Sequence, residues 1–317
     1  MEQQVARFLE QLETERGFSN NTISAYRNDL RQFLSFMESG RVIQSWQELG
    51  EGHLTSYVLH LREREYARST IARKVAAVKS YCHFLVREGV LRADPSDNLA
   101  SPRVDKFAPK AISEESVRLL LAKPEELGTP EALRDKAMLE TLYATGMRVS
   151  ELTSLDVADF DLARSEIVCG KRPDRERRIP VCDTAVDALT KYLTEGRPHL
   201  RGATTVSALF LNHRGNRLTR QGFWLILKAY ADACGIADIT PHTIRHSFAV
   251  HKLANGSEIR DIQQIMGHMS LSTTQVYQQV IGKDGHDPSI ANHDGLDKDG
   301  VLVEEVERVR ERPSTTD

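Results

Sequence analysis

A histidine- and arginine-containing segment near residue 240 has the residue types and spacing of an anion-binding or catalytic site. Thr240 is a favourable helix N-cap and Pro241 suits the first helical position, so a helix is expected to begin here. Its polar side chains then occupy positions i, i+3 and i+4, on one helix face: His242, Arg245 and His246. The free N–H groups of a first helical turn favour a bound anion. Alone, the pattern also fits a surface feature or a satisfied buried network.

A second group of reactive side chains follows. Ser257 is the expected N-cap of a helix that ends at Gly267, and His268 lies directly beyond that end. The run 272–275, Ser-Thr-Thr-Gln, forms a capping box that predicts another helix, with Tyr277 in its first two turns. A lone tyrosine on such a helix is usually packed in a core or an interface.

Upstream segments supply further charged groups. Arg148, followed by Glu151, lies where two predicted helices meet, a position that is most often structural. Two strand-like segments, 166–169 and 178–181, flank a basic turn at 170–177, as in a β-hairpin.

The elements that must hold these side chains follow from the spacing of apolar residues. The first hundred residues predict four amphipathic helices, which would form a small bundle. The fourth is expected to run from an N-cap at Ser69 to Gly89, with Arg68, Lys74 and Lys79 away from its apolar side. There these cations could meet a DNA backbone, although a solvated face is the commoner reason for such a cluster.

A proline-containing linker at 94–110 is expected to separate this bundle from a second domain that starts at the N-cap Ser113. The second domain predicts helices at about 114–122, 132–145, 183–195 and 219–234, and a further strand at 209–211.

The charge of the chain is unevenly distributed. The formal net charge is −3, but residues 283–317 carry 10 acidic and 5 basic residues, so the remainder has a net charge of +2. The cysteines are scattered without a CxxC pair, so neither a zinc site nor a disulfide framework is expected. The sequence also lacks an export signal and an apolar run of membrane-spanning length, which together with the cysteine usage predicts a cytoplasmic protein without membrane contact.

The order and spacing of these segments resemble the tyrosine recombinase (phage integrase) family, and within it the Xer-like branch. The matching segments are TGMRVSEL at 145–152, GKRPDRERRIP at 170–180, HTIRHSFAVHKL at 242–253, and MGH at 266–268 followed by LSTTQVY at 271–277. The resemblance implies a mainly α fold with a small β-sheet. It divides the chain into an N-terminal four-helix, SAM-like DNA-binding domain (1–100) and a catalytic domain (111–282). Composition and apolar spacing, not the resemblance, predict an acidic tether with a candidate terminal helix at 283–317.

The resemblance also implies an active-site set: Arg148, Lys171, His242, Arg245, His268 and Tyr277. Two guanidiniums can hold the non-bridging phosphate oxygens, and His268 would add a donor. Tyr277 would attack phosphorus to give a 3′-phosphotyrosyl link and a free 5′-hydroxyl, with His242 as the proton acceptor and Lys171 as the acid for the 5′-oxygen. The covalent link conserves the bond energy, so no cofactor and no metal are expected.

Other cations and neighbours are expected to support this chemistry. Glu151 would buttress Arg148, and His246 would either support the arginines or simply pack within its helix. The residues expected to hold DNA phosphates are Arg68, Arg73, Lys74, Lys79, Arg172, Arg175, Arg177 and Arg178.

The expected function is site-specific recombination of double-stranded DNA by a homo- or hetero-tetramer on paired sites, resolving chromosome or plasmid dimers, with an accessory regulator as a further candidate partner. The alternatives are the integrase of a mobile element, a type IB topoisomerase, and a non-cleaving DNA-binding protein on the same fold. The C-terminal segment departs from Xer-like relatives, which end soon after the tyrosine in a short helix that docks on the neighbouring subunit. Here 40 residues follow Tyr277 (317 − 277), with Leu302, Val306 and Val309 on one face of the candidate terminal helix.

Overall fold

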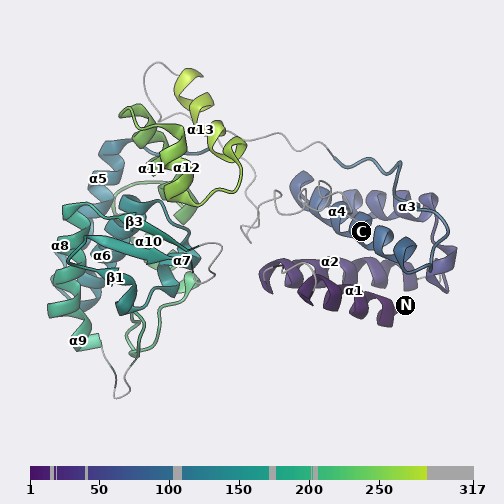
Figure 1. Cartoon of the computed structure of the whole chain (residues 1–317), viewed down its shortest axis with the longest axis horizontal. Coiled ribbons are helices and arrows are strands. Elements are labelled where there is room, and N and C mark those ends of the chain that lie inside the picture. The colour runs from purple at the N-terminus through teal and green to yellow at the C-terminus, as the bar shows by residue number, and fades with distance from the viewer. Residues whose placement is uncertain are drawn as a thin grey trace, which may run out of the picture. The chain divides into compact units, whose positions relative to one another are not determined.

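The computed structural model describes residues 1–14, 18, 20–39, 42–102, 109–170, 176–200, 202 and 206–283. These residues form two compact units, one within the first 102 residues and one from residue 109 onward (Figure 1). No helix among them is both long enough and apolar enough to cross a membrane. The mainly α fold with a small sheet is confirmed, whereas the candidate terminal helix lies outside the described residues.

The first unit is a helical bundle, as the apolar spacing predicted. Its helices are α1 (Glu2–Thr14), α2 (Asn20–Glu38), α3 (Glu51–Glu63) and α4 (Arg68–Arg87), with a short 3-10 helix at Trp46–Glu48. Their apolar faces meet in one core, in which Leu12, Leu30 and Leu54 are at most 1% exposed. Helix α4 begins after Ala67, so Ser69 is not its N-cap. Gly89 lies just beyond the helix with a positive φ of 70°, which suits its expected role as a stop.

Helix α4 buries one of the cations expected to point outward. Lys74 is 3% exposed, and its Nζ donates to Asp29 Oδ1 and to Gln32 Oε1 of α2, both at 2.8 Å. Arg73 donates to the other oxygen of Asp29 at 2.5 Å. Lys74 lies three residues after Ile71 and four before Val78, both buried, and this spacing places it on the apolar face. The expected outward position of Lys74 is therefore wrong: in this structure Lys74 compensates a buried carboxylate.

The second unit packs helices around a small sheet. Its helices are α5 (Glu114–Ala122), α6 (Pro130–Thr145), α7 (Val149–Ser154), α8 (Asp183–Lys191), α9 (Arg197–Leu200), α10 (Arg220–Ala233), α11 (Pro241–Ala254), α12 (Ile259–Met266) and α13 (Leu271–Lys283). Short 3-10 helices lie at Lys123–Glu126 and Val157–Asp159, and a π-helical turn at Tyr192–Gly196 joins α8 to α9.

The sheet is antiparallel in the order β1 (Phe160–Asp161), β2 (Glu166–Cys169), β3 (Arg177–Pro180). The expected hairpin corresponds to β2 and β3, where Ile167 pairs with Ile179; β1 was not expected. The strand expected at 209–211 is wrong: among the described residues its backbone makes one isolated bridge, from Leu211 to Arg217, and no ladder with another strand.

The last three helices hold the segments singled out in the sequence. Thr240 Oγ1 accepts from Thr243 N at 3.1 Å, so α11 begins where expected. The N-cap of α12 is Glu258 rather than Ser257. Helix α13 begins at Leu271, and the side chain at its start that accepts a backbone N–H is Ser270 rather than Ser272. Ser270 Oγ accepts from Ser272 N at 3.2 Å. The start of α12 differs from the expectation by one residue and that of α13 by two, because the cap is set by local turn geometry. A small core joins the three helices through Phe248, Ile262, Met266 and Tyr277.

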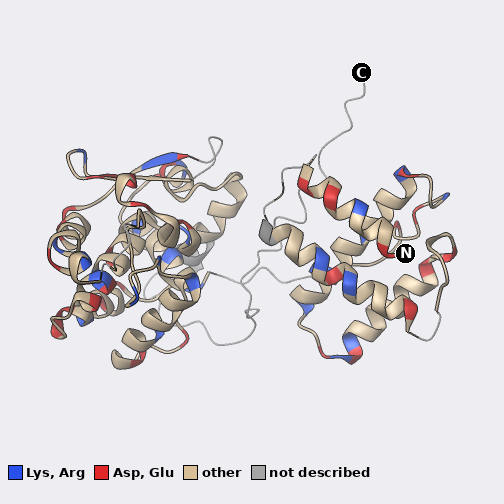
Figure 2. Cartoon of the chain, turned by 90° about the horizontal axis from the view of Figure 1, so that it is seen from below, with Lys and Arg blue, Asp and Glu red and all other residues tan. Residues whose placement is uncertain are grey.

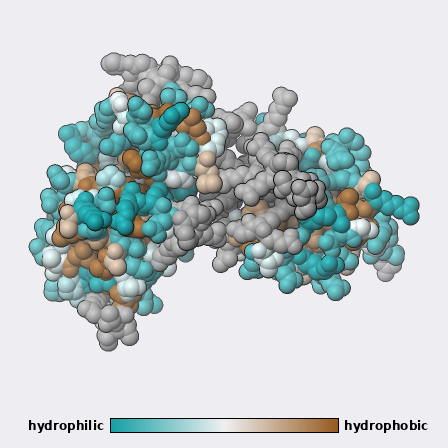
Figure 3. All heavy atoms as spheres, viewed as in Figure 1, coloured by the Kyte–Doolittle hydropathy of each residue, from teal (hydrophilic) through white to brown (hydrophobic). Residues whose placement is uncertain are grey.

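The surface is mixed in charge and polarity. Figure 2 shows Lys and Arg interspersed with Asp and Glu on the helices of both units. Figure 3 shows hydrophobic residues in small patches among hydrophilic ones, and several large side chains such as Leu127 and Met269 are more than half exposed. A phosphate-binding site must therefore come from local geometry rather than from a broad field.

Candidate active site

A tight corner between α6 and α7 begins the site. Gly146 ends α6 in the left-handed region, with φ 55° and ψ 20°. A Cβ at this position would lie 2.3 Å from Cδ1 of Phe248 on α11, so only glycine allows the two helices to approach this closely. The corner directs the carbonyl of Gly146 toward Arg245 and makes Arg148 the N-cap residue of α7.

Arg245 is the buried guanidinium of the site. It is 4% exposed, and its Nη1 donates to Gly146 O while its Nη2 donates to Met266 O at 2.9 Å. Burial, and then repulsion from Arg148, lower the pKa of Arg245 to about 10, which leaves it charged at neutral pH. The two carbonyls thus hold a permanent cation at the meeting point of α6, α11 and α12.

His268 is bound to this guanidinium in one defined tautomer. Arg245 Nη2 lies 2.8 Å from His268 Nε2, and a guanidinium can only donate, so Nε2 accepts. The ring proton is then on Nδ1, which donates to Thr274 Oγ1 at 2.9 Å. Burial, followed by the nearby Arg245, lowers the pKa of His268 to about 3, so the ring is neutral. In this arrangement Nε2 of His268 has no proton to donate to a phosphate.

Glu151 connects two arginines. Its carboxylate accepts from Arg177 Nη1 at 3.0 Å and Nη2 at 2.9 Å, and from the backbone N–H of Arg148 at 2.8 Å. The guanidinium of Arg148 makes only a longer contact of 3.4 Å, and its side chain is 39% exposed. Burial acts to raise the pKa of Glu151, but the hydrogen bonds and charge of Arg177 outweigh it and hold the pKa at about 2. Arg148 therefore has a fixed backbone and an accessible head group.

Arg177 belongs to this network, although the sequence suggested contact with DNA. Its Nε donates to Ile265 O at 2.7 Å, and its guanidinium lies against Gly267, where a Cβ would lie 3.0 Å from Cζ. Its neighbour Arg178 is 54% exposed and 3.7 Å from Glu166, so it remains accessible to a phosphate.

Tyr277 is almost fully buried, at 3% exposure. Its phenol oxygen lies 2.9 Å from Nδ1 of His246, and its ring lies nearly parallel to that of His268 with centroids 6.4 Å apart. Burial, followed by repulsion from His242, lowers the pKa of His246 to about 3. A neutral ring with such a low pKa can hold the phenol but is a weak base at neutral pH.

His242, the expected proton acceptor, lies one helical turn before His246, with ring centroids 6.3 Å apart. Burial, then Arg245 and Arg148, lower the pKa of His242, so the ring is neutral and can take a proton. Five of the six expected site residues thus gather in one region: Arg148, His242, Arg245, His268 and Tyr277. Lys171 lies outside the described residues, as do Arg172 and Arg175.

The sequence did not single out three groups of the site. Thr274 fixes the His268 tautomer, and the carbonyls of Gly146 and Met266 hold Arg245. Thr274 lies three residues before Tyr277, one turn earlier on α13, and that spacing was the available signal. The two carbonyl contacts could not be predicted from the sequence, because every residue has a backbone carbonyl.

Comparison with known proteins gives consistent matches over most of the chain. The description "Phage integrase family" matches residues 110–282, and "Phage integrase, N-terminal SAM-like domain" matches residues 5–89. A tyrosine recombinase XerC of Herpetosiphon aurantiacus is 50% identical over 280 residues, covering 88% of this chain and 91% of that protein. A tyrosine recombinase XerD of Halalkalibacterium halodurans is 42% identical over 274 residues, covering 86% and 91%.

A solved structure of the XerH site-specific recombinase bound to palindromic difH substrate, a post-cleavage complex, has a TM-score of 0.70. The two chains are 17% identical, and the match covers 88% of this chain and 83% of the XerH chain, so it supports likeness of fold alone.

Proposed function

The chain belongs to the phage integrase family and is a tyrosine recombinase, and from this premise we propose that Tyr277 is the nucleophile with which it cuts and rejoins DNA at specific sites. The single observation that carries the proposal is the contact set around Arg245. One buried guanidinium is held by two carbonyls beside His268, and the ring of His268 lies beside that of Tyr277. The names of its relatives support the same activity.

The proposed reaction begins with a phosphate held between Arg148 and Arg245. These two cations would stabilise the charge that builds on the non-bridging oxygens as Tyr277 attacks phosphorus. A P–O bond to the phenol oxygen forms and the bond to the 5′-oxygen breaks, which leaves a 3′-phosphotyrosyl link. Attack by a 5′-hydroxyl reverses the step and restores the DNA strand.

Two proton transfers accompany the cleavage. The phenol proton would pass to His242, because the low pKa of His246 makes that ring a poor acceptor. Lys171 would protonate the departing 5′-oxygen, as the family resemblance implies. A bound phosphate would add negative charge near the rings of His242 and His246 and raise their pKa values.

The contacts described above would have to change when DNA binds. Tyr277 is buried against His246, and Nε2 of His268 accepts from Arg245 instead of facing a substrate. If the Arg245 guanidinium instead donated to a phosphate, Nε2 of His268 would be released. A protonated His268 could then donate to the same phosphate. In this proposal His246 holds the phenol before DNA arrives.

The biological role proposed is the resolution of chromosome or plasmid dimers by a tetramer on two DNA sites. It is supported by relatives named XerC and XerD that match along most of their length. A mobile-element integrase is the second candidate, since solved integrase structures such as that of the Tn1549 transposon share the fold, with a TM-score of 0.68 at 18% identity.

The test is to incubate the full chain with plasmids that carry fragments of its own chromosome and to map the covalent attachment points. Dimer resolution predicts attachment at one chromosomal sequence and conversion of two-site plasmids into separate circles. Attachment at the ends of a mobile element would support the second candidate. Relaxation of supercoils without a defined attachment sequence would contradict both.

A further inference from the structure

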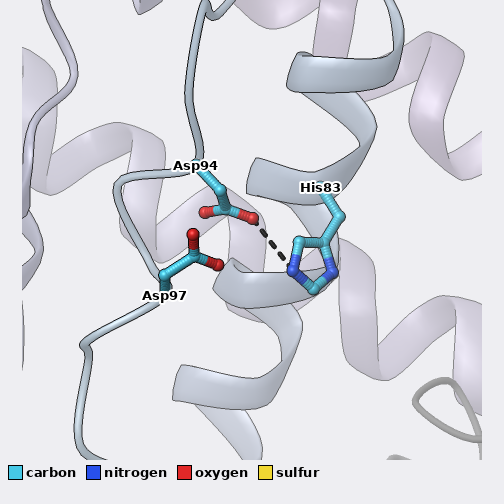
Figure 4. A group of neighbouring side chains, drawn as sticks. All are labelled: His83, Asp94 and Asp97. Atoms are coloured by element: carbon cyan, nitrogen blue, oxygen red, sulfur yellow. Dashed lines mark ion pairs between the residues drawn. The ribbon is translucent and has the colours of Figure 1, made fainter.

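Three potential metal ligands meet in the first unit, in a place that the recombination chemistry does not use. His83 is on α4, and Asp94 and Asp97 are on the segment that follows it (Figure 4). One ligand atom from each residue lies within 4.8 Å of the other two, and the three side chains face one another (Figure 4).

Asp94 is fixed and nearly buried within this cluster. Its Oδ1 accepts from the backbone N of Ser96 at 2.7 Å and from the Ser96 hydroxyl at 2.6 Å. The side chain is 9% exposed, so the other oxygen, Oδ2, has little access to water. The backbone turn thus directs Oδ2 toward the cluster.

Asp94 Oδ2 accepts no hydrogen bond. Oδ2 is buried without a hydrogen-bond partner, although Nε2 of His83 lies only 2.9 Å away. The contact is close enough for an ion pair, but its geometry is not that of a hydrogen bond, so the ring nitrogen does not point directly at the oxygen. A buried carboxylate oxygen in this state is destabilising unless a cation compensates it.

We propose that His83, Asp94 and Asp97 bind one divalent first-row transition-metal ion, with Zn²⁺ as the reference ion. One imidazole nitrogen and two carboxylate oxygens are typical ligands of such ions, whereas Mg²⁺ and Ca²⁺ prefer ligand sets made of oxygen alone. Asp97 is exposed and the His83 side chain is 60% exposed, so the ion has an entry path and room for a water ligand.

Metal binding would connect the last turns of α4 to residues 94–97, which lie between Leu91 and Leu99, two residues of the bundle core. Because an ion that binds only the folded state stabilises it, the site would strengthen the first unit without taking part in DNA cleavage. The sequence analysis expected no zinc site because the cysteines form no CxxC pair. That criterion could not detect this cluster, since its ligands are one histidine and two aspartates.

The experiment is calorimetric titration of Zn²⁺ into the full-length chain after treatment with a chelator, repeated with variants. His83→Ala and Asp97→Asn change exposed side chains and are expected to fold, whereas Asp94→Asn also disturbs the turn at Ser96. Each of the first two should weaken the binding of one Zn²⁺ equivalent by at least about tenfold. His213→Ala, at an exposed histidine elsewhere, should bind as the wild type does.

The active-site histidines could bind Zn²⁺ as well, so the decisive quantity is the difference between the wild type and each variant. In thermal unfolding, Zn²⁺ should raise the midpoints of the wild type and of His213→Ala by the same amount, and that of His83→Ala by less. If His83→Ala and Asp97→Asn bind Zn²⁺ with the stoichiometry and affinity of the wild type, the cluster is only an ion pair and the proposal is wrong. The proposal is equally wrong if the wild type binds no Zn²⁺.

Discussion

The phenol oxygen of Tyr277 lies 2.9 Å from Nδ1 of His246, and the tyrosine side chain is 3% exposed. The phenol of Tyr277 is thus held by a neutral ring and shielded from water. If Tyr277 is the nucleophile, as proposed, its phenol must leave His246 for the phosphate, and His242 and His246 on α11 have different roles.

His242 and His246 should differ in their effect on cleavage. General-base catalysis typically contributes a factor of about 10² to 10⁴, so His242→Ala should lower the single-turnover cleavage rate by that order. His246→Ala should lower it less, because this ring holds the phenol only before DNA binds. Rates are measured with a nicked suicide substrate at saturating protein. If His246→Ala is the more impaired of the two, the acceptor role belongs to His246.

The two guanidiniums should be needed for cleavage more than for binding. Arg148→Ala and Arg245→Ala each remove preorganised charge stabilisation worth about 3–4 kcal/mol, or about 10² to 10³ in rate. DNA binding, measured by gel shift, should fall far less because other phosphate contacts remain. Arg178→Ala is the matched control, since its exposed side chain should affect binding and its salt dependence but not the cleavage step. Near-normal cleavage by Arg148→Ala or Arg245→Ala contradicts the assignment.

The corner at Gly146 should tolerate no side chain. Gly146→Ala combines a left-handed backbone, which costs about 1–2 kcal/mol for alanine, with overpacking against Phe248, which costs about 1–3 kcal/mol more. Gly128→Ala is the control, because Gly128 also has a positive φ, 61°, but its Cβ would meet no atom within 4 Å. Urea unfolding should show a clearly larger loss for Gly146→Ala; equal losses would exclude the close approach of α11.

The pairing of Glu151 with Arg177 should give a pH-dependent contribution to stability. The pKa of Glu151 falls from 4.5 to about 2 on folding, so the pair stabilises the fold fully above about pH 4.5 and loses this effect as pH falls toward 2. The shift corresponds to about 3 kcal/mol as an order of magnitude.

Glu151→Gln tests this pairing. The difference in unfolding free energy between wild type and variant should be largest at neutral pH and shrink below pH 4.5. The histidines with lowered pKa also destabilise the fold in acid, but they are common to both proteins and cancel in the difference. A difference that stays constant from pH 7 to pH 3 would mean that Glu151 is not held as an ion by Arg177.

Much of the fold and of the candidate site could be predicted from sequence because the signals were local. The caps Ser113 and Thr240 and the glycine stops Gly89 and Gly267 fix helix ends through contacts of a few residues. The candidate active-site residues came from motif spacing, and five of them lie in one region of the second unit.

The errors arose where a residue's environment is set by distant parts of the chain. The spacing of Lys74 from Ile71 and Val78 places it on the apolar face, but the carboxylate that it compensates there, Asp29, lies 45 residues earlier. Arg177 lies inward because it shares a strand face with buried Ile179 and meets Glu151, 26 residues earlier. The alternation along β3 could have identified Arg177, since residues two apart point to the same side. The carbonyl contacts of Arg245 depend on three helices and have no counterpart in the sequence.

The central claim, that Tyr277 forms the covalent bond to DNA, is tested most directly by Tyr277→Phe on a nicked suicide substrate resolved on a denaturing gel. The wild type should give a protein–DNA adduct attached through a 3′-phosphate, and phenylalanine, which lacks only the hydroxyl, should give none while binding the same DNA with similar affinity. Tyr143→Phe, which removes the hydroxyl hydrogen-bonded to His251, is the matched control and should still form the adduct. An undiminished adduct with Tyr277→Phe would contradict the account.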